Sequence, residues 1–143
     1  MDENLKREII MDNYQDPFHR GLVSDESYQK VNTNSESCID NLDFMIKIDN
    51  NVIEDIRFDG ESCAISTAAS SILVRKLIGK SVEEAKNILI QYEHMVHEKE
   101  YDEDVLGELN AFNEIYKQPN RTNCALMPEF AIEKLLGGLD NGK

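Results

Sequence analysis

Two consecutive stretches of alternating polarity constrain the fold of this chain most strongly. The first, residues 41–49, places apolar side chains at every second position: Leu42, Phe44, Ile46 and Ile48, set against Asp43, Met45 and Lys47. This period of two is typical of a half-buried strand. Two asparagines at 50–51 are a turn signal, and "VIEDIRFDG" continues as a second strand that ends at Gly60. The sequence therefore predicts a β-hairpin, with a further strand possible before Cys38.

Helical periodicity appears on both sides of the hairpin. Near the N-terminus, residues 3–15 carry four apolar side chains at helical spacing: Leu5, Ile9, Ile10 and Tyr14. Pro17 is expected to end this helix. After the hairpin, a run rich in small residues starts at Ala64 and closes at Gly79, which predicts a buried helix lying tightly on the sheet.

Three further segments favour helices in the C-terminal half. Ser81 and Glu84 form a capping-box pattern at the start of an amphipathic helix. Residues 106–116 favour a short helix, and a final helix is expected from about Asn123 to Leu136, ended by two glycines.

Strands first and helices afterwards predict an α+β fold, with a small antiparallel sheet of about three strands covered by helices. The 143 residues are expected to form a single domain, residues 1–143, because this length is typical of one domain.

The charge of the chain limits its partners. It has 28 acidic and 15 basic residues and a formal net charge of −13. Nucleic acid is excluded as a partner on this ground, because phosphate binding needs a basic face. A basic protein partner agrees better with such a surface.

The expected cellular compartment of the protein decides how its three cysteines are interpreted. The start, "MDENLKREII", lacks the apolar stretch of a signal peptide, and no run of about 18 apolar residues predicts a membrane span. We therefore expect a cytoplasmic protein that does not bind membranes. In a reducing compartment, an odd number of cysteines indicates metal-binding or catalytic thiols rather than disulfides.

All three cysteines lie among polar residues. Cys38 and Asp40 are two positions apart, so in an extended chain both side chains point the same way. Cys63 and Cys124 are each expected at the start of a helix, where unpaired N–H groups favour a thiolate. Three thiolates and one carboxylate would suit zinc or an iron–sulfur cluster. Arg121, one turn before Cys124, would offset negative charge or hold Asp40.

The spacing alone leaves alternatives open. The chain has no C-x-x-C pair, and the separations match no zinc-finger pattern, so three unrelated cysteines remain an interpretation. His94 and His97 are three residues apart and favour exposed polar side chains, since no third ligand accompanies them.

Four motifs together resemble the U-type iron–sulfur cluster assembly proteins, over about residues 5–136. They are "REIIMDNYQDPFHRGL", Cys38-x-Asp40, "VIEDIRFDGESCAISTAASS" and "RTNC". Within this family the chain resembles the SufU branch. The long segment before the last cysteine is similar to that branch, and Asn123 stands where the IscU scaffold branch has histidine.

The resemblance implies a site, a partner and an activity. The implied ligands of a zinc ion are Cys38, Asp40, Cys63 and Cys124, with Arg121 in support. The implied partners are a SufS-type cysteine desulfurase and downstream iron–sulfur assembly proteins. Cys38 would accept persulfide sulfur from the desulfurase after a histidine of that enzyme replaces it on zinc.

One position departs from the family pattern. The family usually has glycine between the first cysteine and the aspartate, and this chain has Ile39. Glycine allows backbone angles that isoleucine resists, so a stiffer or differently shaped loop is expected.

Three functions follow as hypotheses. The first is a zinc-dependent sulfurtransferase. The second is a scaffold on which a [2Fe–2S] cluster is assembled and transferred, which needs the same cysteines and is not an enzyme in the same sense. The third is a structural zinc domain that only binds partners. The residue before Cys124 and the long preceding segment favour the first.

Overall fold

The computed structural model describes residues 1–33 and 41–140, with side chains up to residue 137. The described residues form a three-stranded sheet, five α-helices and two 3-10 helices. In chain order these are α1 (Glu3–Gln15), β1 (Gln29–Asn32), β2 (Asn41–Asp49), β3 (Val52–Glu61), α2 (Ala64–Leu77), α3 (Val82–Val96), α4 (Glu103–Leu106), η1 (Gly107–Phe112), η2 (Ile115–Lys117) and α5 (Pro119–Asp140).

The sheet is antiparallel with strand order β1-β2-β3, and the predicted hairpin is its β2–β3 pair. Asn50 and Asn51 both have positive φ, 53° and 65°. Two such residues are the signature of the two-residue turn whose twist matches that of a hairpin. The resulting register places Phe44 opposite Phe58. The strand expected before Cys38 is present as β1.

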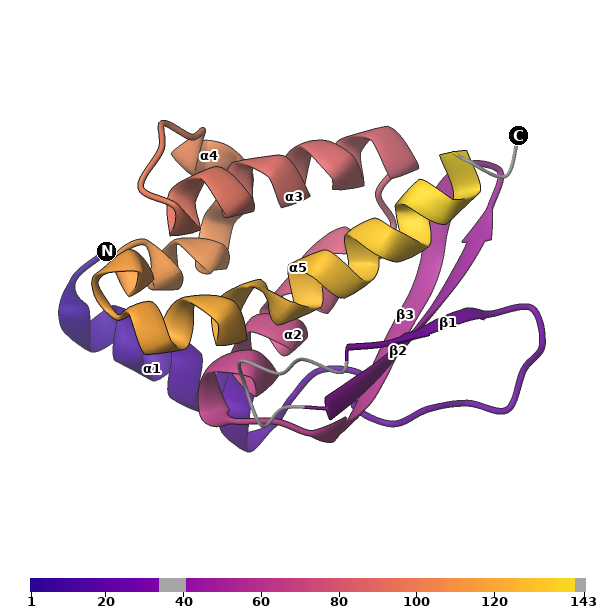
Figure 1. The fold of residues 1–143 in the computed structure, drawn as a ribbon, viewed down its shortest axis with the longest axis horizontal. Helices are drawn as coiled ribbons and strands as arrows, with labels where there is room; N and C mark the ends of the chain where they lie inside the picture. Colours follow the sequence, from indigo (N-terminus) through magenta and orange to yellow (C-terminus); the bar gives the residue numbers. More distant parts are fainter. Residues whose placement is uncertain (34–40, 141–143) are drawn as a thin grey trace.

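The helices gather on one side of the sheet, as Figure 1 shows, so the predicted α+β fold is confirmed. Six side chains of the hairpin are almost fully buried beneath them: Leu42, Phe44, Ile46, Ile53, Ile56 and Phe58. Met45, on the opposite face of β2, is also buried. The alternation of the sequence therefore identifies the core face, because successive strand residues point to opposite sides.

Helix α2 lies at the centre of the helical layer and contacts both α1 and α5. Its small side chains are fully buried, in agreement with the prediction of a tightly packed helix: Ala68, Ala69, Ser70 and Ser71. Ser71 also joins α2 to α1, because its hydroxyl donates a 2.7 Å hydrogen bond to Oδ1 of Asn13. The same hydroxyl accepts a 2.8 Å hydrogen bond from the backbone N–H of Phe18.

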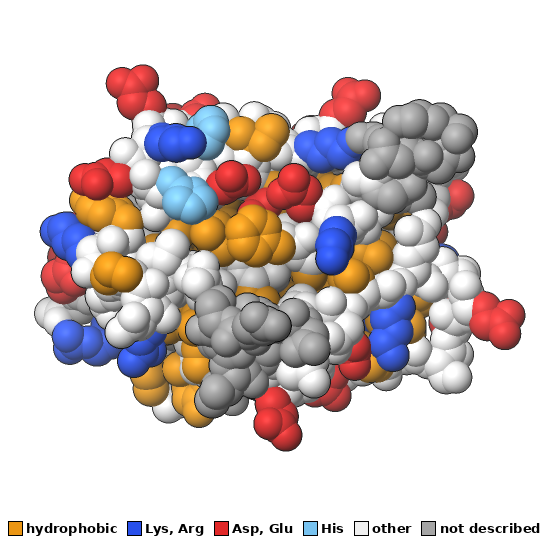
Figure 2. All heavy atoms as spheres, viewed as in Figure 1, with side chains coloured by type: hydrophobic (Ala, Val, Ile, Leu, Met, Phe, Trp, Pro, Cys, Tyr) orange, Lys and Arg blue, Asp and Glu red, His pale blue; other side chains and the backbone are white. Residues whose placement is uncertain are grey.

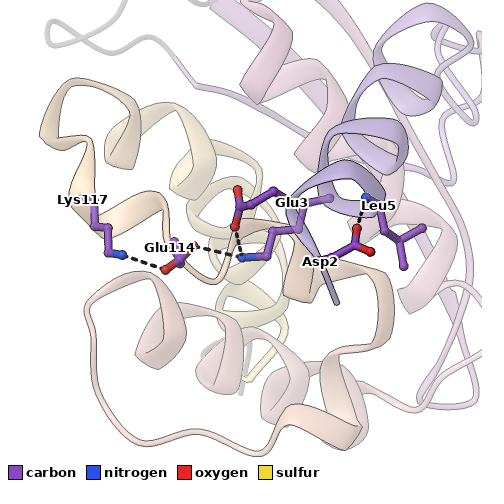
Figure 3. A network of polar contacts seen from close by, with 6 residues as sticks. Asp2, Glu3, Leu5, Glu114 and Lys117 are labelled. Carbon is purple, nitrogen blue, oxygen red and sulfur yellow. Dashed lines mark hydrogen bonds and ion pairs between the residues drawn. The ribbon is translucent and has the colours of Figure 1, made fainter.

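The bounds of α1 agree with the prediction, but its buried face differs. Leu5 and Tyr14 are exposed, and Lys6 is buried in place of Leu5. The amino group of Lys6 lies 3.1 Å from both Glu3 and Glu114, and Glu114 in turn pairs with Lys117 at 2.7 Å (Figure 3). Burial of the Lys6 stem leaves its charge at the surface, where this network ties α1 to η2.

The final helix corrects two expectations. It begins at Pro119, four residues earlier than expected, and continues through Gly137 to Asp140. Proline is favourable in the first turn of a helix because it has no N–H to satisfy, and glycine in a helix costs only about 1 kcal/mol. The short helix expected over 106–116 is instead made of η1 and η2. No helix within the described ranges is long and apolar enough to cross a membrane.

Candidate metal centre

Cys63 lies where β3 ends and α2 begins. It is the N-cap of α2, and its Sγ accepts a 3.4 Å hydrogen bond from the backbone N–H of Ser66. The side chain is half-buried. The sulfur thus occupies the place of an ordinary capping oxygen, where N–H donors and the helix dipole stabilise negative charge. The expectation that Cys63 begins a helix is confirmed.

Cys124 lies deeper in its helix than expected. Because α5 begins at Pro119, Cys124 is in the second turn, beyond the four residues whose N–H groups lack a helical partner. The expectation that Cys124 starts a helix is therefore wrong, and its thiol is not at the end of α5 where unpaired N–H groups favour a thiolate. Cys124 is 5% exposed, and burial rather than capping defines its surroundings.

Ser66 connects the two cysteine-bearing helices. Its hydroxyl donates a 2.9 Å hydrogen bond to the backbone carbonyl of Cys124. It also lies 3.7 Å from the sulfur of Cys63. One buried side chain thus contacts both cysteines, and it holds the start of α2 against the second turn of α5.

The sequence of α5 explains why the carbonyl of Cys124 accepts a hydrogen bond from another helix. Pro128 lies inside α5, four residues after Cys124. A helical residue would normally donate its N–H to the carbonyl four residues earlier, and proline has no N–H. The Ser66 hydroxyl takes the place of that donor. Neither Ser66 nor Pro128 was singled out from the sequence, although a proline within a helical pattern indicates that the carbonyl four residues earlier loses its usual helical donor.

Cys38, Ile39 and Asp40 lie outside the described residues, so the expected four-residue ligand set stays a prediction. The described ends of the neighbouring strands are close together. The N–H of Thr33 donates a 2.8 Å hydrogen bond to the carbonyl of Leu42. Asn41 pairs with Glu61, two residues before Cys63. The described residues on either side of this segment, Thr33 and Asn41, therefore lie at the end of the sheet where β3 leads to Cys63.

Gly60 is required at this end of the sheet. Its φ is +133°, and a Cβ atom there would meet the carbonyl oxygen of Asn41 at 2.2 Å. That is a backbone contact, so a side chain could fit only if the strands moved apart. The close approach fixes β3 against the residue that follows Asp40 in the sequence.

Arg121, the predicted supporting residue, is exposed in the first turn of α5. It precedes Cys124 by three residues, so both lie on neighbouring positions of the same helix surface. Its expected contact with Asp40 stays a prediction, because Asp40 lies outside the described residues.

The family model for the NifU-like N-terminal domain matches residues 5–125 of this chain. The chain belongs to this family. The match includes all three cysteines and confirms the resemblance to U-type iron–sulfur cluster assembly proteins.

Individual relatives agree with this result. This chain is 34% identical over 133 residues to the "Zinc-dependent sulfurtransferase SufU" of Bacillus subtilis, and the match covers 92% of this chain and 89% of the relative. It is 31% identical over 134 residues to the "Iron-sulfur cluster assembly scaffold protein IscU" of Streptococcus pyogenes, covering 93% and 83%.

Solved structures show the same fold. A candidate iron–sulfur cluster assembly scaffold protein for the SUF system, from Fervidobacterium islandicum AW-1, superposes with a TM-score of 0.80 at 30% identity. That match covers 90% of this chain and 94% of the other. An N-terminal NifU-like protein from Brucella abortus superposes with a TM-score of 0.82 at 16% identity, over 99% of this chain and all of the other.

Proposed function

We propose that this NifU-like chain is a zinc-dependent sulfurtransferase that accepts persulfide sulfur from a SufS-type cysteine desulfurase for iron–sulfur cluster assembly. The observation that carries the proposal is the Ser66 contact that joins the elements of Cys63 and Cys124. The similarity to a relative named as a zinc-dependent sulfurtransferase supports it.

The residues present suit zinc. Cys63 and Cys124 would supply two sulfur ligands from the described part of the chain, and Cys38 and Asp40 would complete a tetrahedral set. Zinc, when bound, would keep the ligating thiols deprotonated at neutral pH. The Ser66 N–H would orient the Cys63 sulfur, and the Ser66 hydroxyl would fix the backbone of Cys124.

The proposed transfer uses Cys38 as the nucleophile. Its thiolate attacks the outer sulfur of the persulfide on the desulfurase and forms a new S–S bond. The S–S bond of the enzyme breaks, and the desulfurase cysteine leaves as a thiolate with the electron pair. The persulfide is then on Cys38, and downstream assembly proteins are the expected recipients.

The test compares Cys38→Ala with wild type in a desulfurase assay that measures sulfide release from cysteine. We expect about one zinc per wild-type chain. We also expect the wild type to stimulate sulfide release by the desulfurase, and Cys38→Ala to lose this stimulation. Ser35→Ala changes the same segment without removing a sulfur and serves as the control. Equal stimulation by Cys38→Ala would show that Cys38 is not the acceptor.

A scaffold for a [2Fe–2S] cluster is the second candidate, because the relatives named IscU are also similar over most of the chain. Anaerobic reconstitution with iron and sulfide separates the two functions. A stable coloured cluster that passes intact to an apo-protein would favour the scaffold over sulfur transfer.

A further inference from the structure

A buried carboxylate without a partner lies on α5, five residues after Cys124. Glu129 is 0% exposed, and neither of its carboxylate oxygens has a hydrogen-bond partner among the described residues. Burial of a charged or polar group without a partner is costly, so an occupant that neutralises this carboxylate is expected.

Two more carboxylates face Glu129. Glu133 follows one turn later on α5, and Glu93 comes from α3. One oxygen of each side chain can be chosen so that all three lie within 4.8 Å of one another. No described cation forms an ion pair with any of the three. Figure 2 shows acidic side chains at the junction of α3 and α5.

The nearby hydroxyl of Tyr92 does not donate a hydrogen bond to Glu129. Tyr92 is fully buried on α3, next to Glu93, and its hydroxyl donates a 2.6 Å hydrogen bond to the backbone carbonyl of Ala125. A hydroxyl has one proton to donate. The Tyr92 hydroxyl therefore uses its proton in the bond to the α5 backbone and has none left for Glu129.

We propose that Glu93, Glu129 and Glu133 bind a hard divalent cation, such as Ca²⁺ or Mn²⁺, between α3 and α5. Carboxylate oxygens are the preferred ligands of such ions. Calcium binds oxygen at about 2.3–2.6 Å, so two ligands on opposite sides of the ion are about 5 Å apart. The three oxygens lie within 4.8 Å of one another, so one ion of this size can contact all three.

The ligand chemistry selects among cations. Magnesium demands near-ideal octahedral geometry and keeps several of its water molecules, so it is seldom held by a site of carboxylates alone. Zinc favours the sulfur ligands proposed around Cys124. Because Glu133 is exposed, water molecules can complete the coordination shell from the solvent side.

A shared proton is the competing occupant. Burial raises the pKa of Glu129 to about 10, and so does a hydrogen bond with the Glu133 carboxyl, which forms only when one of the two carries a proton. The charges of Glu133 and Glu93 raise this pKa as well. A proton would neutralise one carboxylate and leave the other two charged, whereas a divalent cation balances two charges and also pulls α3 toward α5. The two occupants therefore predict different responses to added metal.

This site is distinct from the thiol centre. Glu129 is five residues beyond Cys124, which is about 7.5 Å along the helix axis. Loss of cation binding would therefore not be loss of zinc, and the two proposals fail separately.

The test titrates the zinc-loaded full-length protein with CaCl₂ and with MnCl₂. Isothermal titration calorimetry follows both ions, and the electron paramagnetic resonance signal of free Mn²⁺ follows the second. We expect one site in the wild type and at least a tenfold loss of affinity in Glu133→Gln, with zinc content unchanged. Glu83→Gln, an exposed residue of α3, is the matched control and should bind as wild type does.

Glu129→Gln completes the test, because it removes the buried charge and is expected to abolish cation binding while the fold persists. The proposal is wrong if the wild type binds neither ion up to about 10 mM, above the range of weak protein calcium sites. It is equally wrong if Glu133→Gln binds as tightly as the wild type. A rise in Tm with Glu129→Gln, without cation binding by the wild type, would assign the site to a shared proton.

Discussion

The hydroxyl of Ser66 donates a 2.9 Å hydrogen bond to the backbone carbonyl of Cys124, which in a regular helix would accept the N–H of residue 128. Pro128 removes that donor, and α2 restores it from a neighbouring helix. The two cysteine-bearing elements are therefore joined through a backbone group rather than through their thiols alone. Changes at Ser66 should affect both the stability of the fold and the placement of the cysteines.

Ser66→Ala should destabilise the protein. The change leaves the buried carbonyl of Cys124 without this donor, at a cost of about 1–3 kcal/mol. For a chain of this size, Tm should fall by roughly 3–10 °C. Differential scanning calorimetry measures the shift. Ser70→Ala is the control, because the Ser70 hydroxyl is buried on the same helix without a hydrogen-bond partner among the described residues, so its removal should be nearly neutral.

Pro128→Ala should reduce the effect of Ser66→Ala. Alanine at this position supplies the N–H that proline lacks, so the carbonyl of Cys124 regains a helical donor. In a double-mutant cycle, the cost of Ser66→Ala should be smaller by about 1 kcal/mol in the Pro128→Ala background. Equal costs in both backgrounds would mean that Ser66 does not compensate for the proline.

Gly60→Ala should be severely destabilising. The new Cβ would meet the Asn41 carbonyl oxygen, and the backbone would keep a φ that alanine rarely adopts. We expect a loss of more than about 3 kcal/mol, from strain together with the clash. Gly21→Ala is the control, since Gly21 has a similar φ of +125° but nothing within 4 Å of an added Cβ. Chemical denaturation of the two variants should separate the cost of the clash from the cost of the strained φ. Similar losses of unfolding free energy in both variants would show that the contact with Asn41 does not matter.

Removal of zinc should lower the stability of the wild type. A metal that binds only the folded chain adds its binding free energy to folding. A zinc-selective chelator should therefore lower Tm by more than about 5 °C in wild type. Cys124→Ala should already lack most of its zinc and respond little. An unchanged Tm in wild type, with zinc shown to be removed, would contradict a structural contribution from the metal.

Glu129→Gln should change how stability depends on pH. The folded-state pKa of Glu129 is about 10 against an ordinary value of 4.5, so the folded chain keeps a proton that the unfolded chain releases. Its contribution to stability is complete below about pH 4.5 and declines as the pH rises toward about 10. Glutamine cannot ionise, so the stability of the variant relative to wild type should increase from about pH 6 to about pH 9.

This comparison is best made by urea denaturation in EDTA, which removes divalent cations from the carboxylate site and zinc from the thiol centre in both proteins alike. The groups that face Glu129 are Tyr92 and Glu93 from α3 and Glu133 from α5. Glu83→Gln, which removes an exposed carboxylate of the same helix, is the matched control. A constant difference between Glu129→Gln and wild type across this range would show that Glu129 does not keep its proton.

Local patterns in the sequence were enough to predict most of the elements. The hairpin followed from alternation and two asparagines, and α3 followed from its capping box, which the structure forms in full. These signals are local, since each depends on residues within a few positions. The bounds of α5 were less accurate, because glycine and proline can lie inside a helix when its neighbours make up for the loss.

The sequence by itself determined the hairpin, the helical layer and, through its motifs, the family and the candidate ligands. The tertiary structure alone decided which face of α1 is buried, that Cys124 is inside its helix, and that Ser66 holds its carbonyl. It also brought Glu93 to Glu129. The reason is physical: periodicity reports which side chains share a face, whereas the neighbour of that face depends on how distant segments pack together.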